Sequence, residues 1–301
     1  MKIAHLILCH TDPAMLKRTA TRLSAFSDVY IHVDSKTDIS DYLMPDSKNI
    51  YFTSKRYNVG WGTWSSVEAE IELLREALSS DKKYDRFVLL QGLDYPIKTD
   101  SEIMDFYKSH PTTEFNRALP VLHSSLQKIR AKATVIHFSK YRCLFTKAIN
   151  VLMRKLKLQL RSGRIIADGI NVEPYWGTAQ WAYTRPCAEY IVNFFDTHPA
   201  FNRWFYLAST VDELYFSTVV YNSDFVKNTF HEDFDTARSG DLDRFKNLTH
   251  FIYDPGHIRI FTVDAAAELQ NSKYLYARKL TSSASSDLMD LLDQVNSNSC
   301  L

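Results

Sequence analysis

Residues 85–98, DRFVLLQGLDYPIK, indicate the fold class more clearly than any other segment of the chain. The first part of this stretch, 85–90, is a short apolar run and predicts a buried strand, while QGLDYPIK predicts a loop. Asp94 is the acidic side chain of that loop. In α/β sheets, ligands bind beyond the carboxyl ends of the strands. Asp94 is therefore a candidate binding residue, and the alternative that it caps a turn stays open.

Strands and helices alternate in the residues before this stretch. Val67, Ile71, Leu74 and Leu78 fall on one face of a helix. This alternation predicts an α/β fold with a mixed, mostly parallel central sheet flanked by helices. The expected strands are 2–9, 28–33 and 49–53, and the expected helices are 15–26 and 65–78.

The second half of the chain continues the mixed pattern. A glycine-centred turn carries Trp176 and Trp181, and a helix is expected from about Pro186. A second helix is expected to start at Asp212 and Glu213, and 257–263 (HIRIFTV) predicts a strand. Residues 281–301 are rich in serine, aspartate and asparagine, which predicts a polar, weakly ordered tail around one short helix.

Composition limits the function classes. The 301 residues are 45% hydrophobic and 24% charged, as in a globular protein with a core. The formal net charge of +1 argues against a nucleic-acid partner. The four cysteines show no metal-binding spacing, so we expect free thiols in a reducing compartment. The apolar run at the start is too short for a signal peptide or a membrane span, which favours a cytoplasmic location.

The segment 140–164 is a basic amphipathic helix by its pattern. Leucine and alanine recur at helical spacing, and lysine and arginine occupy the other positions. One interpretation is a helix packed on the core with a solvated basic face. The other is peripheral contact with an anionic surface, which would be the inner face of the cytoplasmic membrane.

Several catalytic motifs are missing from the sequence. It contains no GxGxxG after a strand, no GxxxxGK[ST], no HExxH and no GxSxG. Dinucleotide oxidoreductases, P-loop enzymes, zincins and α/β-hydrolases are therefore disfavoured. The sequence also lacks a DxD triplet, in which clustered carboxylates hold a divalent cation on a nucleotide diphosphate.

The chain resembles the core-2/I-branching β-1,6-N-acetylglucosaminyltransferase family, whose relatives include peptide O-xylosyltransferases. The matching stretches occur in the order of the family and span nearly the whole chain. They are HLILCH, YIHVDSK (30–36), WGTWSSVEAEIELLREAL (61–78), FVLLQGLDYPIKT (87–99), WGTAQWAYTRPCAEYIV (176–192), VDELYFSTVV (211–220), GHIRIFTV (256–263) and YARKL (276–280).

This resemblance implies a GT-A-type fold and an inverting, metal-independent transfer from a UDP-sugar, with no cofactor. It implies that Glu213 is the catalytic base and that Arg259 and Lys279 bind the donor diphosphate. The residue types suit the reaction, because inversion needs one base and positive charge on the leaving group. We assign His10, Asp34 and Asp94 to the nucleotide and sugar pocket.

The acceptor side is defined less sharply by the sequence. Trp176, Gln180 and Asp212 lie in matching loops, and Glu114, Lys128 and Arg130 fall where the family holds its acceptor. The resemblance implies one catalytic domain, 1–280, with a nucleotide-sugar-binding part to about 110 and an acceptor and catalytic part in 111–280.

The chain also departs from the vertebrate members of the family. It has neither their N-terminal membrane anchor nor their disulfide cysteines, which favours a bacterial cytoplasmic enzyme of surface polysaccharide biosynthesis. The expected donor is UDP-GlcNAc, with UDP-xylose or another UDP-sugar as the alternative. The expected acceptor is a glycan or a lipid-linked glycan.

Three other classes of function remain open at this point. They are a non-catalytic sugar- or nucleotide-binding module, a retaining glycosyltransferase and a glycoside hydrolase with paired carboxylates.

Overall fold

The computed structural model describes residues 1–140, 143–156, 161–229, 246–254 and 256–299. A five-stranded sheet forms its centre, in the order β10-β4-β1-β2-β3. β10 is antiparallel to β4 and the other neighbours are parallel, so the predicted mixed, mostly parallel sheet is confirmed. The bounds of these strands are β1 (Ile3–Cys9), β2 (Asp28–Val33), β3 (Ile50–Phe52), β4 (Arg86–Gln91) and β10 (Ala182–Thr184).

The remaining strands form small sheets. Their bounds are β5 (Asp94–Pro96), β6 (Ala118–Pro120), β7 (Ile165–Ala167), β8 (Ile170–Val172), β9 (Tyr175–Gly177), β11 (Thr249–His250), β12 (Tyr253–Asp254), β13 (His257–Ile258) and β14 (Tyr276–Arg278). The pairs are β6-β9, β7-β8 and β12-β13, and β14 lies between β11 and β5. The sequence predicts a strand over 257–263, but within this segment the structure has a strand only at His257–Ile258, so the prediction is wrong for the later residues. Residues 259–262 are not assigned to a strand, although Arg259 and Phe261 exchange backbone hydrogen bonds with the stretch after β14.

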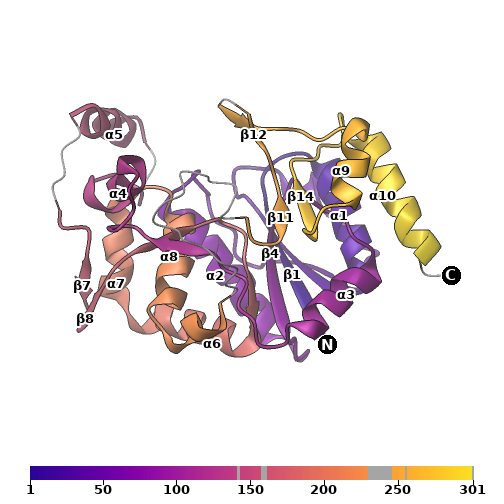
Figure 1. Ribbon diagram of the computed structural model, residues 1–301, viewed down its shortest axis with the longest axis horizontal. Coiled ribbons are helices and arrows are strands. Elements are labelled where there is room, and N and C mark those ends of the chain that lie inside the picture. The colour runs from indigo at the N-terminus through magenta and orange to yellow at the C-terminus, as the bar shows by residue number, and fades with distance from the viewer. Residues whose placement is uncertain (141–142, 157–160, 230–245, 255, 300–301) are drawn as a thin grey trace.

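Helices cover both faces of the central sheet (Figure 1). Their bounds are α1 (Pro13–Ser24), α2 (Trp64–Ser79), α3 (Asp100–Ser109), α4 (Gln127–Thr134), α5 (Leu144–Leu156), α6 (Arg185–Thr197), α7 (Pro199–Trp204), α8 (Val211–Tyr221), α9 (Ala266–Gln270) and α10 (Ser286–Ser299). Short 3₁₀ turns are η1 (Ile39–Asp41), η2 (Phe205–Leu207), η3 (Asp224–Asn228) and η5 (Val263–Ala265).

The core lies on the two sides of β1, whose residues are all buried. Because side chains alternate along a strand, Leu6 packs with α2, α6 and α8, whereas Ile7 packs with α1 and α3. Because β1, β2 and β4 run parallel to one another, their carboxyl ends lie at the same edge of the sheet. Asp34 follows β2 at this edge, and Asp94 follows β4 three residues after its end.

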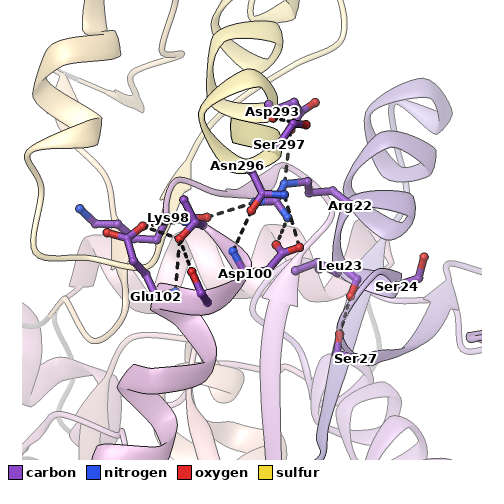
Figure 2. Close-up of polar contacts among 12 residues, drawn as sticks. Arg22, Leu23, Ser24, Ser27, Lys98, Asp100, Glu102, Asp293, Asn296 and Ser297 are labelled. Atoms are coloured by element: carbon purple, nitrogen blue, oxygen red, sulfur yellow. Dashed lines mark hydrogen bonds and ion pairs between the residues drawn. The ribbon is translucent and has the colours of Figure 1, made fainter. Parts of the chain in front are cut away.

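The C-terminal residues contain the one helix that the sequence predicts, but this helix is docked on the core and is not part of a weakly ordered tail. Leu288, Met289 and Leu292 of α10 are buried in a core cluster shared with β5 and β14. Figure 2 shows the polar part of this contact, in which Arg22 of α1 forms ion pairs with Asp100 of α3 and Asp293 of α10. Three apolar side chains therefore outweigh the polar composition on which the prediction rested.

Candidate functional site

Glu213 lies in the first turn of α8, three residues after Thr210, whose backbone is strained. Thr210 precedes this helix with φ = 49°, in the left-handed region that a β-branched side chain rarely adopts. Gly62, also at positive φ, packs against it: a Cβ there would lie 3.2 Å from the Thr210 Cα. Strain of this kind persists where surrounding structure imposes it, and it gathers at functional sites. The helix start is thus fixed by close backbone packing.

Two donors hold one oxygen of Glu213. The indole Nε1 of Trp176 donates to Oε2 over 2.6 Å, and Nζ of Lys132 donates to the same oxygen over 3.1 Å. Nζ of Lys132 also donates to Oγ1 of Thr210 over 2.6 Å and lies 4.9 Å from the Trp176 ring centroid. Within the described residues, Oε1 of Glu213 has no hydrogen bond. The carboxylate is thereby oriented with one oxygen left for a ligand.

Asp212 points the other way, into the interior. Its Oδ1 is enclosed without a hydrogen-bond partner in the described structure, and the same holds for Oε1 of buried Glu70. Burial, followed by the charge of Glu213, raises the pKa of Asp212 to about 7. Burial and then Asp212 raise the pKa of Glu70. The acceptor-side role of Asp212 stays a prediction from the sequence.

A cleft of about 360 Å³ opens beside the turn that carries Glu213. Ser209 and Thr210 line one wall, and residues of α5 line another. Trp61 borders the cleft and is 79% exposed, so its flat ring is available to a ligand. Aromatic faces of this kind suit pyranose rings.

A second group of charged residues gathers around Asp94. β5 and β14 are antiparallel, and Asp94 and Arg278 are register partners. Nη1 of Arg278 donates to Oδ1 of Asp94 over 2.7 Å, while the Gln91 amide donates to Oδ2 over 2.9 Å. Asp94 is fully buried, so this carboxylate acts by holding the guanidinium in place.

Arg259 and Lys279 are brought together by the backbone, as their predicted shared role requires. The amide of Lys279 donates to the carbonyl of Arg259 over 3.2 Å. Burial and then the charge of Arg278 lower the pKa of Lys279. Arg259 is half-buried and pairs with exposed Asp264 over 3.3 Å. Arg259, Arg278 and Lys279, which we call the basic cluster, are incompletely neutralised and suit a phosphate ligand.

One short segment joins the two groups. Trp176 at one end binds Glu213, and Gln180 at the other end donates to Oδ2 of Asp94 over 3.5 Å. Four residue steps reach at most about 14 Å. The carboxylate and the basic cluster are therefore linked through one stretch of backbone at the same edge of the sheet.

Asp34 binds Lys36, which lines a hollow of about 650 Å³; this hollow adjoins the cleft, because Thr63 and Lys147 line both. Oδ2 of Asp34 accepts from Nζ of Lys36 over 2.6 Å, and Lys36 with Tyr57 lines the hollow. Asp34 is buried and acts there through Lys36. His10 is exposed just after β1, and its carbonyl accepts from the Thr37 hydroxyl.

Three predicted acceptor residues form no hydrogen bond or ion pair with Glu213 within the described part of the chain. Glu114 is 1% exposed, and its carboxylate accepts from the amide and hydroxyl of Thr184, which fixes the end of β10. Lys128 is exposed on α4, and Arg130 donates to the carbonyl of Ser124. Lys128 lies one helical turn before Lys132 on the same side of α4. The acceptor role of these three residues stays a prediction from the sequence.

Two residues that the sequence analysis did not single out belong to these groups. Lys132 lies on the same short helix as Lys128 and Arg130, and the packing of this helix against the start of α8 places Lys132 on Glu213. Arg278 precedes Lys279, and the antiparallel pairing with β5 directs it to Asp94. Lys132 and Arg278 each lie among other cations, which is a signal that the sequence offers. The sequence does not show their partners, because Glu213 and Asp94 lie far from them along the chain.

The described residues contain no group of three or more His, Cys, Asp or Glu side chains that would hold a metal ion. No helix in the described part of the chain combines the length and the apolar character needed to cross a membrane.

Comparison with known proteins adds a family. The sequence model of the family described as Core-2/I-Branching enzyme matches residues 3–239, which include Glu213 but not Arg259, Arg278 or Lys279. The chain is 26% identical over 196 residues to the human "Probable beta-1,3-galactosyl-O-glycosyl-glycoprotein beta-1,6-N-acetylglucosaminyltransferase 7", an alignment that covers 63% of this chain and 43% of that protein.

Two further relatives match shorter stretches. The human "Beta-1,3-galactosyl-O-glycosyl-glycoprotein beta-1,6-N-acetylglucosaminyltransferase" is 32% identical over 111 residues, 34% of this chain and 25% of that protein. The "Xylosyltransferase oxt" of Drosophila melanogaster is 31% identical over 90 residues, 29% of this chain and 10% of that protein. The chain thus matches less than half the length of each of these three relatives.

Proposed function

Because the chain belongs to the Core-2/I-Branching enzyme family and is therefore a glycosyltransferase, we propose that it moves GlcNAc from UDP-GlcNAc to a hydroxyl of a glycan acceptor, with inversion and without a metal ion. The observation that carries this proposal is the carboxylate of Glu213, which is held through one oxygen three residues after Thr210, a residue that lines the cleft.

The base follows from the geometry of Glu213. An inverting transfer is one displacement at the anomeric carbon, and the acceptor hydroxyl must lose its proton as it attacks. Trp176 and Lys132 bind Oε2, so Oε1 takes the proton from the hydroxyl. The oxygen of that hydroxyl forms the new bond to the sugar while the bond from the sugar to the diphosphate breaks.

The basic cluster supplies the charge that the departing UDP needs. Negative charge grows on the diphosphate as the bond breaks, and fixed cations stabilise it in the transition state. Arg278 is held by Asp94, and Lys279 lies beside it with a lowered pKa. An anion bound there relieves the repulsion between these cations, which favours the bound donor.

The decisive experiment replaces Glu213 with Gln, which keeps the shape and an acceptor oxygen but cannot take a proton. We expect the rate of sugar transfer, or of UDP-GlcNAc hydrolysis, to fall roughly 10²- to 10⁴-fold. Binding of UDP, measured as a shift in the melting temperature Tm, should stay. Glu189→Gln, an exposed change on α6, is the matched control. Wild-type turnover in Glu213→Gln would overturn the assignment.

Metal independence and donor identity are tested in the same assay. Activity should persist in excess EDTA; activity abolished by EDTA and restored by Mn²⁺ would overturn the metal-free mechanism. UDP-xylose is the alternative donor, because one relative is named a xylosyltransferase. Nucleotide binding without turnover of any donor would favour the non-catalytic module.

We propose a lipid-linked glycan as the acceptor, supported by the helix that borders the cleft. The cytoplasmic location, the bacterial source and the role in surface polysaccharide synthesis stay predictions from the sequence.

A further inference from the structure

The helix α5 turns its apolar side away from the protein. Leu144 is 84% exposed, Phe145 is 72% exposed, and Leu152 and Leu156 are each 54% exposed. These four residues, which we call the apolar face, lie on one side of a helix of 3.6 residues per turn. In Figure 1, α5 lies at the upper left, at the periphery of the molecule and away from the central sheet.

The side of α5 that meets the protein is mixed, because its half-buried residues are Thr146, Ile149, Asn150 and Met153. Oδ1 of Asn150 accepts from the amide of Phe138 over 2.8 Å, and its Nδ2 donates to the carbonyl of Phe138 over 3.0 Å. An ordinary surface helix buries its apolar stripe and shows its polar one. α5 instead exposes its leucines and Phe145, so the interpretation of this segment as a helix packed on the core by its leucines is wrong.

The surroundings of the apolar face are strongly basic. Between residues 115 and 167 the sequence has no aspartate or glutamate. The cations of this stretch are Arg117, Lys128, Arg130, Lys132, Lys140, Arg142, Lys147, Arg154, Lys155, Lys157, Arg161 and Arg164. Of these, Lys140, Lys147 and Lys155 are exposed on α5 or immediately before it, whereas 141–142 and 157–160 lie outside the described residues. The charge is local, because the whole chain has a net charge of only +1.

We propose that α5 is a membrane-surface anchor that inserts its apolar face into the interface of an anionic lipid bilayer. A helix lying in the plane of the interface needs an outward apolar side and flanking cations, and it does not need the length of a membrane span. α5 has both features. The lysines bind the negative headgroups, and the leucines and Phe145 enter the boundary of the acyl chains.

Charge decides between a bilayer and a second copy of the chain. Two copies meeting through α5 would bring two basic, acid-free segments together, and like charges across an interface repel. A bilayer containing anionic lipids offers the complementary charge together with an apolar layer. The lipid surface is therefore the occupant that fits both properties of the helix.

This anchor also sets the place of the reaction, a step that rests on the proposed function. Thr146, Lys147, Asn150 and Val151 of α5 line the cleft that Thr210 borders on its other side. A helix lying on the membrane thus holds the cleft beside Glu213 close to the lipid headgroups. An acceptor glycan attached to a lipid reaches this cleft without leaving the bilayer.

The test is co-sedimentation of the full chain with vesicles, either of phosphatidylcholine alone or of equal parts phosphatidylcholine and phosphatidylglycerol. We expect binding to the anionic vesicles that weakens as salt is added, because salt screens the attraction to the headgroups. The triple substitution Leu144→Ser, Phe145→Ser and Leu152→Ser should weaken that binding roughly tenfold or more. The control Leu291→Ser with Val295→Ser changes exposed apolar residues of α10 and should bind like the wild type.

Three outcomes would overturn the anchor: no binding, equal binding to both kinds of vesicle, or unchanged binding by the triple variant. A dimer in solution that the triple variant dissociates would assign the apolar face to a second copy instead. Vesicle binding needs no sugar chemistry, so its failure is distinct from failure of the proposed function. Hydrolysis of UDP-GlcNAc by the triple variant in solution, expected at the wild-type rate, separates the two.

Discussion

Asp212 makes the stability of this protein depend on pH in a predictable way. Its Oδ1 is enclosed without a hydrogen-bond partner among the described residues, next to Glu213 and near buried Glu70. Burial is the first cause and the Glu213 charge the second cause that raise its pKa from 3.8 to about 7. The folded protein therefore prefers the neutral carboxyl, whereas the unfolded chain ionises it at lower pH.

The sign and size of the effect follow from proton linkage. Between pH 4 and 7 the folded state binds more protons than the unfolded state, so the free energy of unfolding contributed by Asp212 falls as the pH rises. Above pH 7 both states are ionised and the contribution is constant. A shift of about three pKa units corresponds to about 4 kcal/mol in all, of which about 2.6 kcal/mol falls between pH 5 and pH 8.

The assay compares the wild type with Asp212→Asn by urea unfolding at pH 5 and at pH 8. Asparagine has nearly the same shape as aspartate but does not ionise. The variant therefore does not lose stability at this position as the pH rises, whereas the wild type does. We expect the variant to gain about 2 to 3 kcal/mol relative to the wild type on going from pH 5 to pH 8.

Asp224→Asn, a change at a 96% exposed side chain, is the control and should keep the same difference from the wild type at both pH values. A difference between Asp212→Asn and the wild type that is equal at pH 5 and pH 8 would refute the reasoning. The wild type and the variant share their other titratable groups, such as the buried histidines. The contributions of these groups therefore cancel in the difference between the two free energies of unfolding.

Three further changes test other contacts. Trp176→Phe keeps an aromatic side chain but removes the donor to Glu213, so kcat should fall roughly ten- to a hundredfold; the smaller ring at this buried position should also lower Tm, and an unchanged kcat contradicts the reasoning. Asp94→Asn removes the carboxylate that holds the neighbouring guanidinium and should weaken UDP binding roughly tenfold, read as a smaller UDP-induced rise in Tm. Arg22→Ala breaks the ion pairs shown in Figure 2 and should lower the free energy of unfolding by about 3 kcal/mol in urea, whereas Lys227→Ala, in an exposed pair, should cost less than about 1 kcal/mol.

The central sheet could be predicted from the sequence because its signal is local. Each buried strand is a short apolar run, and α2 carries its apolar stripe at helical spacing. The edge at which the strands end follows from their parallel order, and so does the placement of Asp34 and Asp94 beside it. These features need only the residues of each element and the rule that parallel strands point the same way.

The sequence alone also named Glu213, Trp176, Arg259 and Lys279, through motifs a few residues long. These motifs identify the segments that contribute to the site, but they do not show which side-chain atoms of those segments are in contact. Only the tertiary structure decided that Trp176 and Lys132 share one oxygen of Glu213. Such a contact joins residues far apart in the chain, and no local pattern encodes it.

The tertiary structure also decided the direction in which two helices face. Both α5 and α10 have an amphipathic pattern, yet the structure docks three apolar residues of α10 in the core and leaves the apolar face of α5 outside. A sequence determines that a helix has an apolar side. Which neighbour covers that side depends on the space and the partners that the rest of the fold provides, and this is why α10 stabilises the domain while α5 is left to meet a membrane.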